Sequence, residues 1–322
     1  MIYNIKIFYF KNRFTQKEKF MIFKGKKDRN FLSLPFWLEK LKKIFVLRKI
    51  RITRENNIKI LTFNIHYNEK EKKGFQENGW KTRKKLVASV IHFHNVDLIG
   101  FQEPIKEQIA ALQPFLIDYD WYGIGLEDGK NQGPFNAIFY RKERFVLLDS
   151  SFFYLSPNST NPSKGWDAHF YRGVTWVKLM DKKSKQIFYF FNTHFDYHGE
   201  EARNKSAILL RQKIKEIVRD IPFIVVGDFN IFPELRGEET YRLLTKKNGG
   251  KRLYDAQKRA LYPHHGPTGS WSGFKEAGQP GIKPDYIFVD KNIQVITHGI
   301  LSDTFDGKFP SDHLPILAEI IF

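Results

Sequence analysis

The stretch from Ile224 to Asn230 constrains the fold most. It opens with three apolar β-branched residues, the pattern of a strand that is buried on both faces. Gly227 then lets the backbone bend or approach another segment closely. If the strand stays extended, Asp228 and Asn230 point the same way and Phe229 points back into the core. Polar groups at such a strand end are placed as active-site groups are in open α/β sheets. The alternative is a strand that ends in an Asx-turn.

Other apolar stretches begin or end in the same kinds of polar side chain. Carboxylates, amides and histidines adjoin predicted strands at Asn64, Glu103, His194, Asp285, Asp312 and His313. Each has a structural alternative: Glu103 could cap the next helix, His194 could be a hydrogen-bonded core histidine, and Asp312 could belong to a turn. Because the pattern recurs on one kind of element, coincidence is the weaker explanation, and we expect one shared site.

Periodicity between these stretches predicts alternating strands and helices. Helices are expected at 79–94, 104–112 and 200–219, and strands at 59–63, 97–101, 135–140, 145–155, 172–179, 186–192, 286–289, 293–300 and 315–321. On the first helix, Leu86, Val90 and Phe93 are assigned to the inner face and Arg83 to the outer face. The strands 135–140 and 145–155 are expected to be neighbours.

Composition excludes several classes of protein and site. The chain has no cysteine, which rules out disulfides, thiolate metal ligands and a cysteine nucleophile. No apolar run approaches the 18 or so residues of a membrane span. Residues 1–57 carry 16 Lys+Arg and 4 Asp+Glu, a net charge of +12, so the other 265 residues account for only +6 of the total of +18. The high isoelectric point is therefore poor evidence that the main domain binds nucleic acid.

The first 57 residues are expected to form a basic N-terminal extension ahead of a catalytic domain at 58–322. Within it, residues 33–51 fit an amphipathic helix, with Ser33 as the cap and Pro35 in the first turn. A basic amphipathic helix can bind an anionic membrane surface, and the alternative is a helix that packs on the main domain. We infer no obligate protein partner. The expected location is the cytoplasm, with membrane association through the extension and secretion without a signal as open alternatives.

The predicted cluster suits metal-assisted chemistry on phosphoesters. Carboxylates without cysteine favour a hard cation such as Mg²⁺ or Mn²⁺ over zinc. Such an ion keeps several waters, which leaves room for a phosphate oxygen. Histidine and asparagine side chains beside it could donate hydrogen bonds to phosphoryl oxygens. This combination indicates hydrolysis of a phosphoester.

Short motifs in this order resemble the endonuclease/exonuclease/phosphatase superfamily. The motifs are Thr62-Phe63-Asn64-Ile65, Ile99-Gly100-Phe101-Gln102-Glu103, Asn192-Thr193-His194, Gly227-Asp228-Phe229-Asn230, Pro284-Asp285-Tyr286-Ile287 and Ser311-Asp312-His313. The segments 165–167, 172–176 and 199–203 resemble a bacterial group allied to the deadenylase and nocturnin-like branch. The resemblance implies an α/β fold, a two-sheet α/β sandwich with helices on the outer faces and the site at one rim.

The resemblance also implies a metal site and a phosphate site. Glu103 resembles the main metal ligand, aided by Asn64 and Asp312. His194 and Asn230 resemble groups that contact the phosphate. The implied cofactor is Mg²⁺ or Mn²⁺.

Catalytic and substrate-binding roles follow from the same resemblance. Asp228 resembles the group that orients or deprotonates water, and His313 with Asp285 resembles a His–Asp pair that acts as base or electrostatic clamp. Arg172 could reach the phosphate or form a structural ion pair. Trp271 could stack on a base or an apolar substrate group, or pack in the core.

The sequence therefore predicts a divalent-metal-dependent phosphodiester hydrolase. The leading hypothesis is a nuclease acting on nucleic acid, with 3′ exonuclease action on RNA as one form. A lipid phosphodiesterase of the sphingomyelinase type or a phosphoinositide phosphatase is the second enzyme hypothesis. A binding module without catalytic activity is the alternative from another class. Endonuclease versus exonuclease action and the choice of Asp228 or His313 as base stay open.

Overall fold

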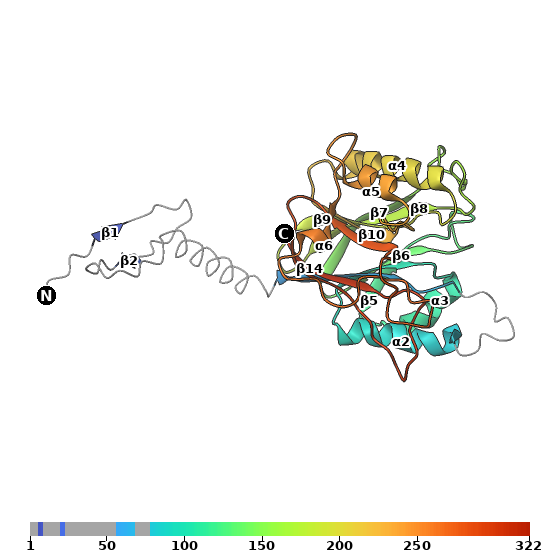
Figure 1. Ribbon diagram of the computed structural model, residues 1–322, viewed down its shortest axis with the longest axis horizontal. Coiled ribbons are helices and arrows are strands. Elements are labelled where there is room, and N and C mark those ends of the chain that lie inside the picture. Colours follow the sequence, from blue (N-terminus) through green and yellow to red (C-terminus); the bar gives the residue numbers. More distant parts are fainter. Residues whose placement is uncertain (1–5, 9–19, 23–55, 68–77) are drawn as a thin grey trace. The chain divides into compact units, whose positions relative to one another are not determined.

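The computed structural model describes residues 6–8, 20–22, 56–67 and 78–322, and the chain divides into two units, Met1–Arg54 and Glu55–Phe322 (Figure 1). In the first unit, strands β1 (Lys6–Phe8) and β2 (Phe20–Ile22) pair antiparallel. The helix predicted over residues 33–51 lies outside the described residues. Among the residues described, no helix combines the length and the apolar character that crossing a membrane requires.

Two six-stranded sheets form the second unit. The first sheet has the order β13 (Gln294–Ile300), β14 (Ile316–Ile321), β3 (Ile58–Asn64), β4 (Leu98–Gln102), β6 (Asn136–Arg141), β5 (Tyr119–Tyr122). The second has the order β11 (Tyr254–Asp255), β12 (Asp285–Val289), β10 (Phe223–Asp228), β9 (Ile187–His194), β8 (Gly173–Asp181), β7 (Phe145–Tyr154). Strand β3 pairs with β4, and β9 with β10, in parallel, and the other pairs are antiparallel.

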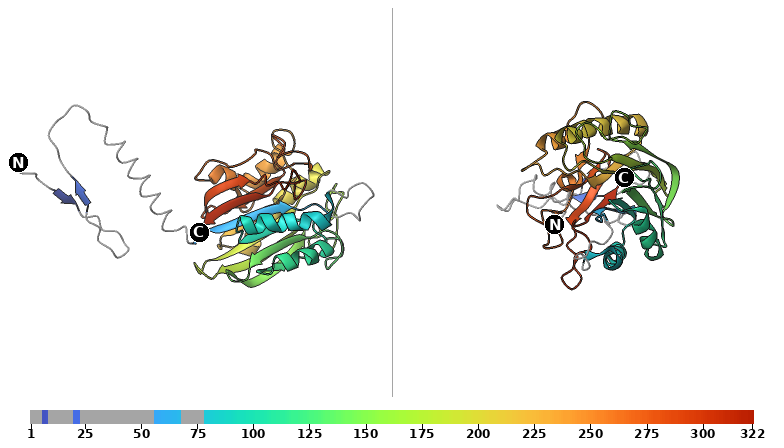
Figure 2. Two further views of the ribbon diagram at one scale, coloured as in Figure 1. Left: turned by 90° about the horizontal axis from the view of Figure 1, so that it is seen from below. Right: turned by 90° about the vertical axis from the view of Figure 1, so that its right-hand side faces the viewer.

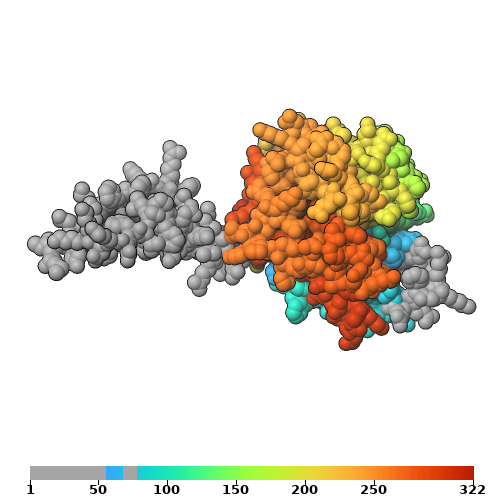
Figure 3. All heavy atoms as spheres, viewed as in Figure 1, coloured from blue at the N-terminus to red at the C-terminus, as the bar shows by residue number. Residues whose placement is uncertain are grey.

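Helices cover the outer face of each sheet. The helices α2 (Trp80–Phe93) and α3 (Lys106–Leu112) pack on the first sheet, and α4 (Glu200–Val218) and α5 (Glu238–Thr245) pack on the second. Two short helical segments, η3 (Gln113–Phe115) and α6 (Ala256–Arg259), complete the unit. Figures 1 and 2 show the four layers, and in Figure 3 the C-terminal part of the chain, orange to red, forms much of the visible face. The expected two-sheet α/β sandwich with outer helices is confirmed.

The strands are apolar on both faces because both faces are covered. On β9, Phe188 and Phe190 point between the sheets, whereas Tyr189 and Phe191 point outward to the helix side. The same alternation on β10 places Val226 between the sheets. Continuous apolar runs rather than polar–apolar alternation therefore mark these strands in the sequence.

The two sheets approach closely beside the strand ends that carry the polar motifs. A Cβ atom on Gly100 would lie 2.4 Å from Cγ2 of Val226, so only glycine fits between the sheets at this position. The side chain of Asn192 donates from the second sheet to two main-chain carbonyls of the first, at 2.8 and 2.9 Å. Its Oδ1 accepts from Nε2 of Gln102 at 2.6 Å. Buried polar bonds thus fix the relative position of the sheets where the site begins.

The predicted inner face of the first helix was wrong for Phe93 and Arg83, whereas Val90 is buried as expected. Phe93 is 81% exposed, whereas Arg83 is 2% exposed. The guanidinium of Arg83 donates to main-chain carbonyls of Ile65 at 2.6 Å and Pro310 at 3.1 Å, and these bonds rotate the helix so that a cation faces inward. An arginine that is buried because it donates to main-chain carbonyls cannot be recognised from the spacing of apolar residues.

The predicted pairing of strands 135–140 and 145–155 was also wrong. They correspond to β6 and β7, which belong to different sheets. Arg144, in the short connection between them, bonds Asp97 at 2.8 Å and Asp181 at 3.3 Å. Asp97 directly precedes β4 of the first sheet, and Asp181 ends β8 of the second. The connection therefore crosses the sandwich and does not form a hairpin. The short elements β5 and α5 were not anticipated.

Candidate active site

The polar strand ends meet at one rim of the sandwich, around a cavity of about 1110 Å³. Every predicted site residue except Asn64 and Asp285 lines this cavity. Those two lie against the side chains that do, as their hydrogen bonds show. Both sheets contribute, because β3 and β4 belong to the first sheet and β9, β10 and β12 to the second. The predicted residues thus lie together at one site, as expected, and their roles stay predictions.

Several strand ends carry unusual backbone conformations. Glu103, Asn230 and His66 have left-handed φ angles of 74°, 50° and 60° although none is glycine. Such conformations cost free energy and persist where the surrounding structure fixes them, often at functional sites. Oδ1 of Asp228 accepts a hydrogen bond from the backbone nitrogen of Asn230 at 2.9 Å. The strand therefore ends in an Asx-turn, and the side chains of Asp228 and Asn230 also line the same cavity. Phe229 is fully buried, as expected.

Asn64 joins two carboxylates. Its Nδ2 donates to Oε1 of Glu103 at 2.9 Å and to Oδ2 of Asp228 at 3.0 Å. Its Oδ1 accepts from the backbone nitrogen of His66 at 3.0 Å. The other Glu103 oxygen accepts from the Tyr67 backbone nitrogen at 2.7 Å. In this geometry Asn64 positions the acids, and a direct bond from Asn64 to a metal stays a prediction.

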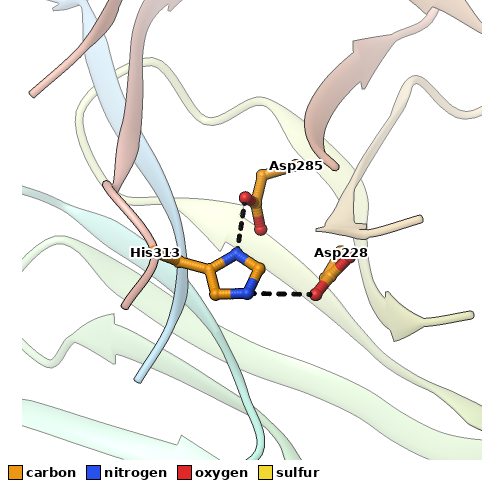
Figure 4. A group of neighbouring side chains, drawn as sticks. All are labelled: Asp228, Asp285 and His313. Atoms are coloured by element: carbon orange, nitrogen blue, oxygen red, sulfur yellow. Dashed lines mark hydrogen bonds and ion pairs between the residues drawn. The ribbon is translucent and has the colours of Figure 1, made fainter. Parts of the chain in front are cut away.

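His313 lies between two carboxylates (Figure 4). Its Nδ1 is 2.9 Å from Oδ2 of Asp285, and its Nε2 is 3.8 Å from Oδ2 of Asp228. The hydroxyl of Ser270 donates to the same Asp285 oxygen at 2.6 Å. Burial opposes the positive charge, but the Asp285 carboxylate and its hydrogen bond outweigh it, so the pKa of His313 is raised well above its usual value. The imidazole is therefore protonated near neutral pH.

Asp228 and His194 are shifted toward their neutral forms. Burial and the nearby Asp285 carboxylate raise the pKa of Asp228 to about 7. Burial and the positive charge of Arg172 lower the pKa of His194 well below its usual value. The side-chain nitrogen Nδ2 of Asn230 lies 3.1 Å from Nε2 of His194, so this ring nitrogen accepts the hydrogen bond. The site thus holds a carboxylate able to take a proton near pH 7 beside a charged and a neutral imidazole.

Arg172 forms an ion pair and also lines the cavity, and its contact with a phosphate stays a prediction. Its Nε lies 3.5 Å from a carboxylate oxygen of Asp196, which is an ion pair. It also lines the cavity, with its guanidinium 5.2 Å from the ring centroid of Phe170. Trp271 lines the cavity as well, and its ring meets that of His313 edge-on at 5.0 Å. Neither residue is confined to the core.

The residues fit a hard divalent cation. Among the described residues, the one group of three ligand-type side chains within 4.8 Å is Asp228, Asp285 and His313. An ion there would disrupt the His313–Asp285 hydrogen bond, so we favour Glu103 and Asp312, two carboxylates on the cavity wall. Magnesium commonly takes one or two carboxylates and keeps its waters. A bound cation would polarise the phosphoryl group and neutralise charge that develops on it.

Sequence reasoning missed part of the site. Nδ1 of His66 lies 2.9 Å from Oδ2 of Asp312, and both side chains line the cavity. His66 follows Asn64 by two residues, so its position at the strand end was the available signal. The aromatic side chains of Phe170 and Tyr197 also line the cavity. They lie on loops without periodicity, and no pattern in the sequence marked them.

A family model described as the Endonuclease/Exonuclease/phosphatase family matches residues 61–313. The chain belongs to this family, and its fold is that of the family's phosphoesterases. A Bacteroides vulgatus member is 36% identical, with a TM-score of 0.75 over 83% of this chain and 99% of that one. A Bacteroides thetaiotaomicron mannosyl-6-phosphatase is 30% identical, with a TM-score of 0.75 over 82% of this chain and 100% of that one.

More distant relatives share the fold or part of the length. The human nocturnin catalytic domain is 23% identical, with a TM-score of 0.63 over 83% of this chain and 93% of that one. A protein of Acanthamoeba polyphaga mimivirus is 26% identical over 82% of this chain, which spans 44% of that relative's length. The resemblance to the superfamily is thereby confirmed, and the likeness to nocturnin concerns the fold alone.

Proposed function

We propose that the chain is a divalent-metal-dependent hydrolase that removes the phosphoryl group from a sugar phosphomonoester. The observation that carries the proposal is the buried Asp228–His313–Asp285 group at a cavity that also presents Glu103 and Asp312. Asp228 accepts a proton from water, protonated His313 stabilises the charge that develops on phosphate, and Asp285 holds the imidazole. Likeness to a mannosyl-6-phosphatase supports the sugar part.

The charges of the cavity support a monoester over a nucleic acid. Arg83 and Arg172 line it, but Arg83 donates to main-chain carbonyls and Arg172 pairs with Asp196. No lysine lies among the described residues that line it. A surface that follows a nucleic-acid backbone needs cations for successive phosphates. One phosphate at Arg172 and a bound metal ion would satisfy the charges described.

Nuclease activity is the second candidate function. The basic extension supports it, because residues 1–57 carry a net charge of +12 and could supply the missing cations. A zebrafish protein with the same fold, TDP2, is known in complex with a single-stranded DNA product at 18% identity, a likeness that concerns the fold alone. Lipid phosphoesters are the remaining class to test.

The purified full-length protein should be assayed with and without Mg²⁺, with His313→Ala as the inactive control. The substrates are methyl mannoside 6-phosphate, glycerol 3-phosphate, single-stranded RNA and DNA, sphingomyelin and phosphoinositides. We expect metal-dependent release of phosphate from the mannoside that His313→Ala abolishes. Cleavage of RNA or DNA without turnover of either monoester would replace the proposal by the nuclease alternative.

A further inference from the structure

Exposed apolar side chains gather at the mouth of the active-site cavity. In the part of the chain that the structure describes, nine large apolar side chains are exposed. Four of them line this one cavity: Tyr67, Phe170, Tyr197 and Leu235. Phe170 and Tyr197 are 52% and 50% exposed. Apolar surface concentrated at one place on a soluble domain marks a contact for a ligand or partner.

Two of these rings form a continuous aromatic wall with a histidine. The ring of His198 lies 4.9 Å from that of Tyr197 and 6.4 Å from that of Phe170. Its other neighbour is His169, which stacks on it at 4.3 Å with an interplanar angle of 19°. We call Phe170, Tyr197 and His198 the aromatic rim, and all three line the cavity.

The backbone beneath the aromatic rim is held by one buried carboxylate. Asp196, which is 2% exposed, accepts hydrogen bonds from the backbone nitrogens of Phe170 at 3.1 Å and His198 at 3.0 Å. The same carboxylate pairs with Arg172, which also lines the cavity. The rim is therefore fixed relative to the cation that would meet the phosphate. A rigid aromatic surface binds a ligand ring with little loss of conformational entropy.

A second cation supports Tyr197 from the neighbouring loop. The guanidinium of Arg236 lies 4.8 Å from the ring centroid of Tyr197 and 4.7 Å from that of Phe232. Cation–π contacts of this kind stabilise the position of an exposed ring. Leu235, the neighbouring residue, is 71% exposed on the same cavity. The loop after β10 thus extends the apolar surface of the rim.

One carboxylate adds a polar contact to this mouth. Glu127 lines the cavity, and its side chain forms no hydrogen bond or ion pair with the described residues. It follows that its oxygens are available to accept hydrogen bonds. A flat apolar surface and a free carboxylate together suit a ring that carries hydroxyl groups, because the ring packs on the aromatic face while the hydroxyls donate to oxygen. A second phosphate near Glu127 would be repelled.

The geometry points to the aromatic rim as a subsite for the sugar ring of the substrate, with Glu127 accepting its hydroxyl groups. This inference deepens the proposed function and rests on it. The phosphate would lie at Arg172, and the ring would extend outward along Phe170 and Tyr197. The rim and Glu127 then determine specificity and take no part in the chemical step.

The test compares two phosphomonoesters of primary alcohols that differ in the presence of a ring. Methyl mannoside 6-phosphate has one and glycerol 3-phosphate has none. Full-length Phe170→Ala, Tyr197→Ala and Glu127→Gln are assayed on both, with Leu148→Ala, 44% exposed on β7 and outside the cavity, as the matched control. Phe170→Leu keeps apolar bulk but removes the flat face.

We expect each rim alanine variant to lower the ratio of kcat/KM for the mannoside over glycerol phosphate by roughly threefold to tenfold, mainly through KM. Glu127→Gln should lower the same ratio. The ratio for Phe170→Leu should lie between those of Phe170→Ala and wild type, and Leu148→Ala should leave the ratio unchanged. Equal losses on the two substrates, or none, would overturn the subsite while the proposed function stands. If the wild type hydrolyses neither monoester, the proposed function and the subsite both fall.

Discussion

The side-chain nitrogen Nδ2 of Asn64 lies 3.0 Å from Oδ2 of Asp228, although the two residues are 164 positions apart in the chain. Asn64 ends β3 of one sheet, and Asp228 ends β10 of the other. The site is therefore assembled only when the two sheets pack with the correct relative position. The buried side chain of Asn192, which bonds across the sheets, fixes that position. Packing of the two sheets therefore also brings the predicted site residues together.

The bond from Asn64 tunes the proton affinity of Asp228. Hydrogen bonding to the carboxylate lowers the pKa of Asp228, which burial otherwise raises. We expect Asn64→Ala to raise this pKa further, so that the rise of kcat/KM with pH moves to higher pH and activity at pH 7 falls. A pH–rate profile of both proteins measures the shift. An unchanged profile with reduced kcat would show that Asn64 serves only to place Glu103.

Asp285 and His313 are expected to act as a unit. Their 2.9 Å bond fixes the imidazole and raises its pKa, so losing either partner removes most of what the pair contributes. Asp285→Asn and His313→Ala should each lower kcat on the order of 10²-fold or more. The double variant should be little worse than the poorer single variant. Multiplicative losses, with folding intact by circular dichroism, would show that the two residues work independently.

The strands and helices that follow a regular apolar pattern were predicted from the sequence. Contacts that leave no such pattern were missed. Continuous apolar runs followed by polar side chains identified the strands that carry Asn64, Glu103, His194 and Asp228, because strands covered on both faces have that pattern. Arg83 was assigned to the wrong face, since its burial depends on carbonyls brought from distant segments. Phe170 and Tyr197 were missed for the same reason: loop residues acquire their neighbours only from the tertiary fold.

The raised pKa of Asp228 predicts a stability that depends on pH when metal is absent. The folded state holds this proton up to about pH 7, whereas an ordinary aspartate releases it near 3.8. The stabilising contribution of the bound proton is therefore present at low pH and is lost as pH rises toward 7. Urea unfolding in chelator at pH 5, 6, 7 and 8 should show a declining free energy of unfolding.

The matched variants isolate this effect. Asp228→Asn should flatten the decline below pH 7 and make the variant more stable than wild type at pH 8, whereas the decline that loss of the His313 proton causes above pH 6.5 should remain. Asp149→Asn, on the exposed part of β7, should leave the decline unchanged. If Asp228→Asn follows the wild-type curve at every pH, another group causes the dependence and the carboxylate is ionised throughout.

Glu103 is expected to govern metal affinity. Its carboxylate lines the cavity and is held by Asn64 and the Tyr67 backbone, so Glu103→Gln removes charge with little change of shape. The variant should need more Mg²⁺ or Mn²⁺ for half-maximal rate and should bind Mn²⁺ more weakly by calorimetry. Glu107→Gln, on the exposed first turn of α3, is the control. Full activity of the wild type in excess chelator would exclude a metal requirement.

The N-terminal extension is expected to be dispensable for the chemistry. Every residue assigned to the site follows residue 57, and the second unit begins at Glu55. Nη2 of Arg144 donates to the main-chain oxygen of Asn56 at 3.0 Å, so a truncation must keep this residue. Residues 55–322 should match full length in rate on a soluble phosphoester.

A second truncation and a membrane assay make this prediction specific. A truncated form with residues 60–322 lacks the main-chain oxygen of Asn56. It also lacks the backbone nitrogen of Lys59, which donates to Asp97 at 2.9 Å. This form should therefore unfold at a lower urea concentration than residues 55–322. If the net charge of +12 on residues 1–57 serves a membrane, only full length should float with anionic liposomes, and less at high salt. Loss of folding in residues 55–322 would show instead that the extension belongs to the core of the catalytic domain.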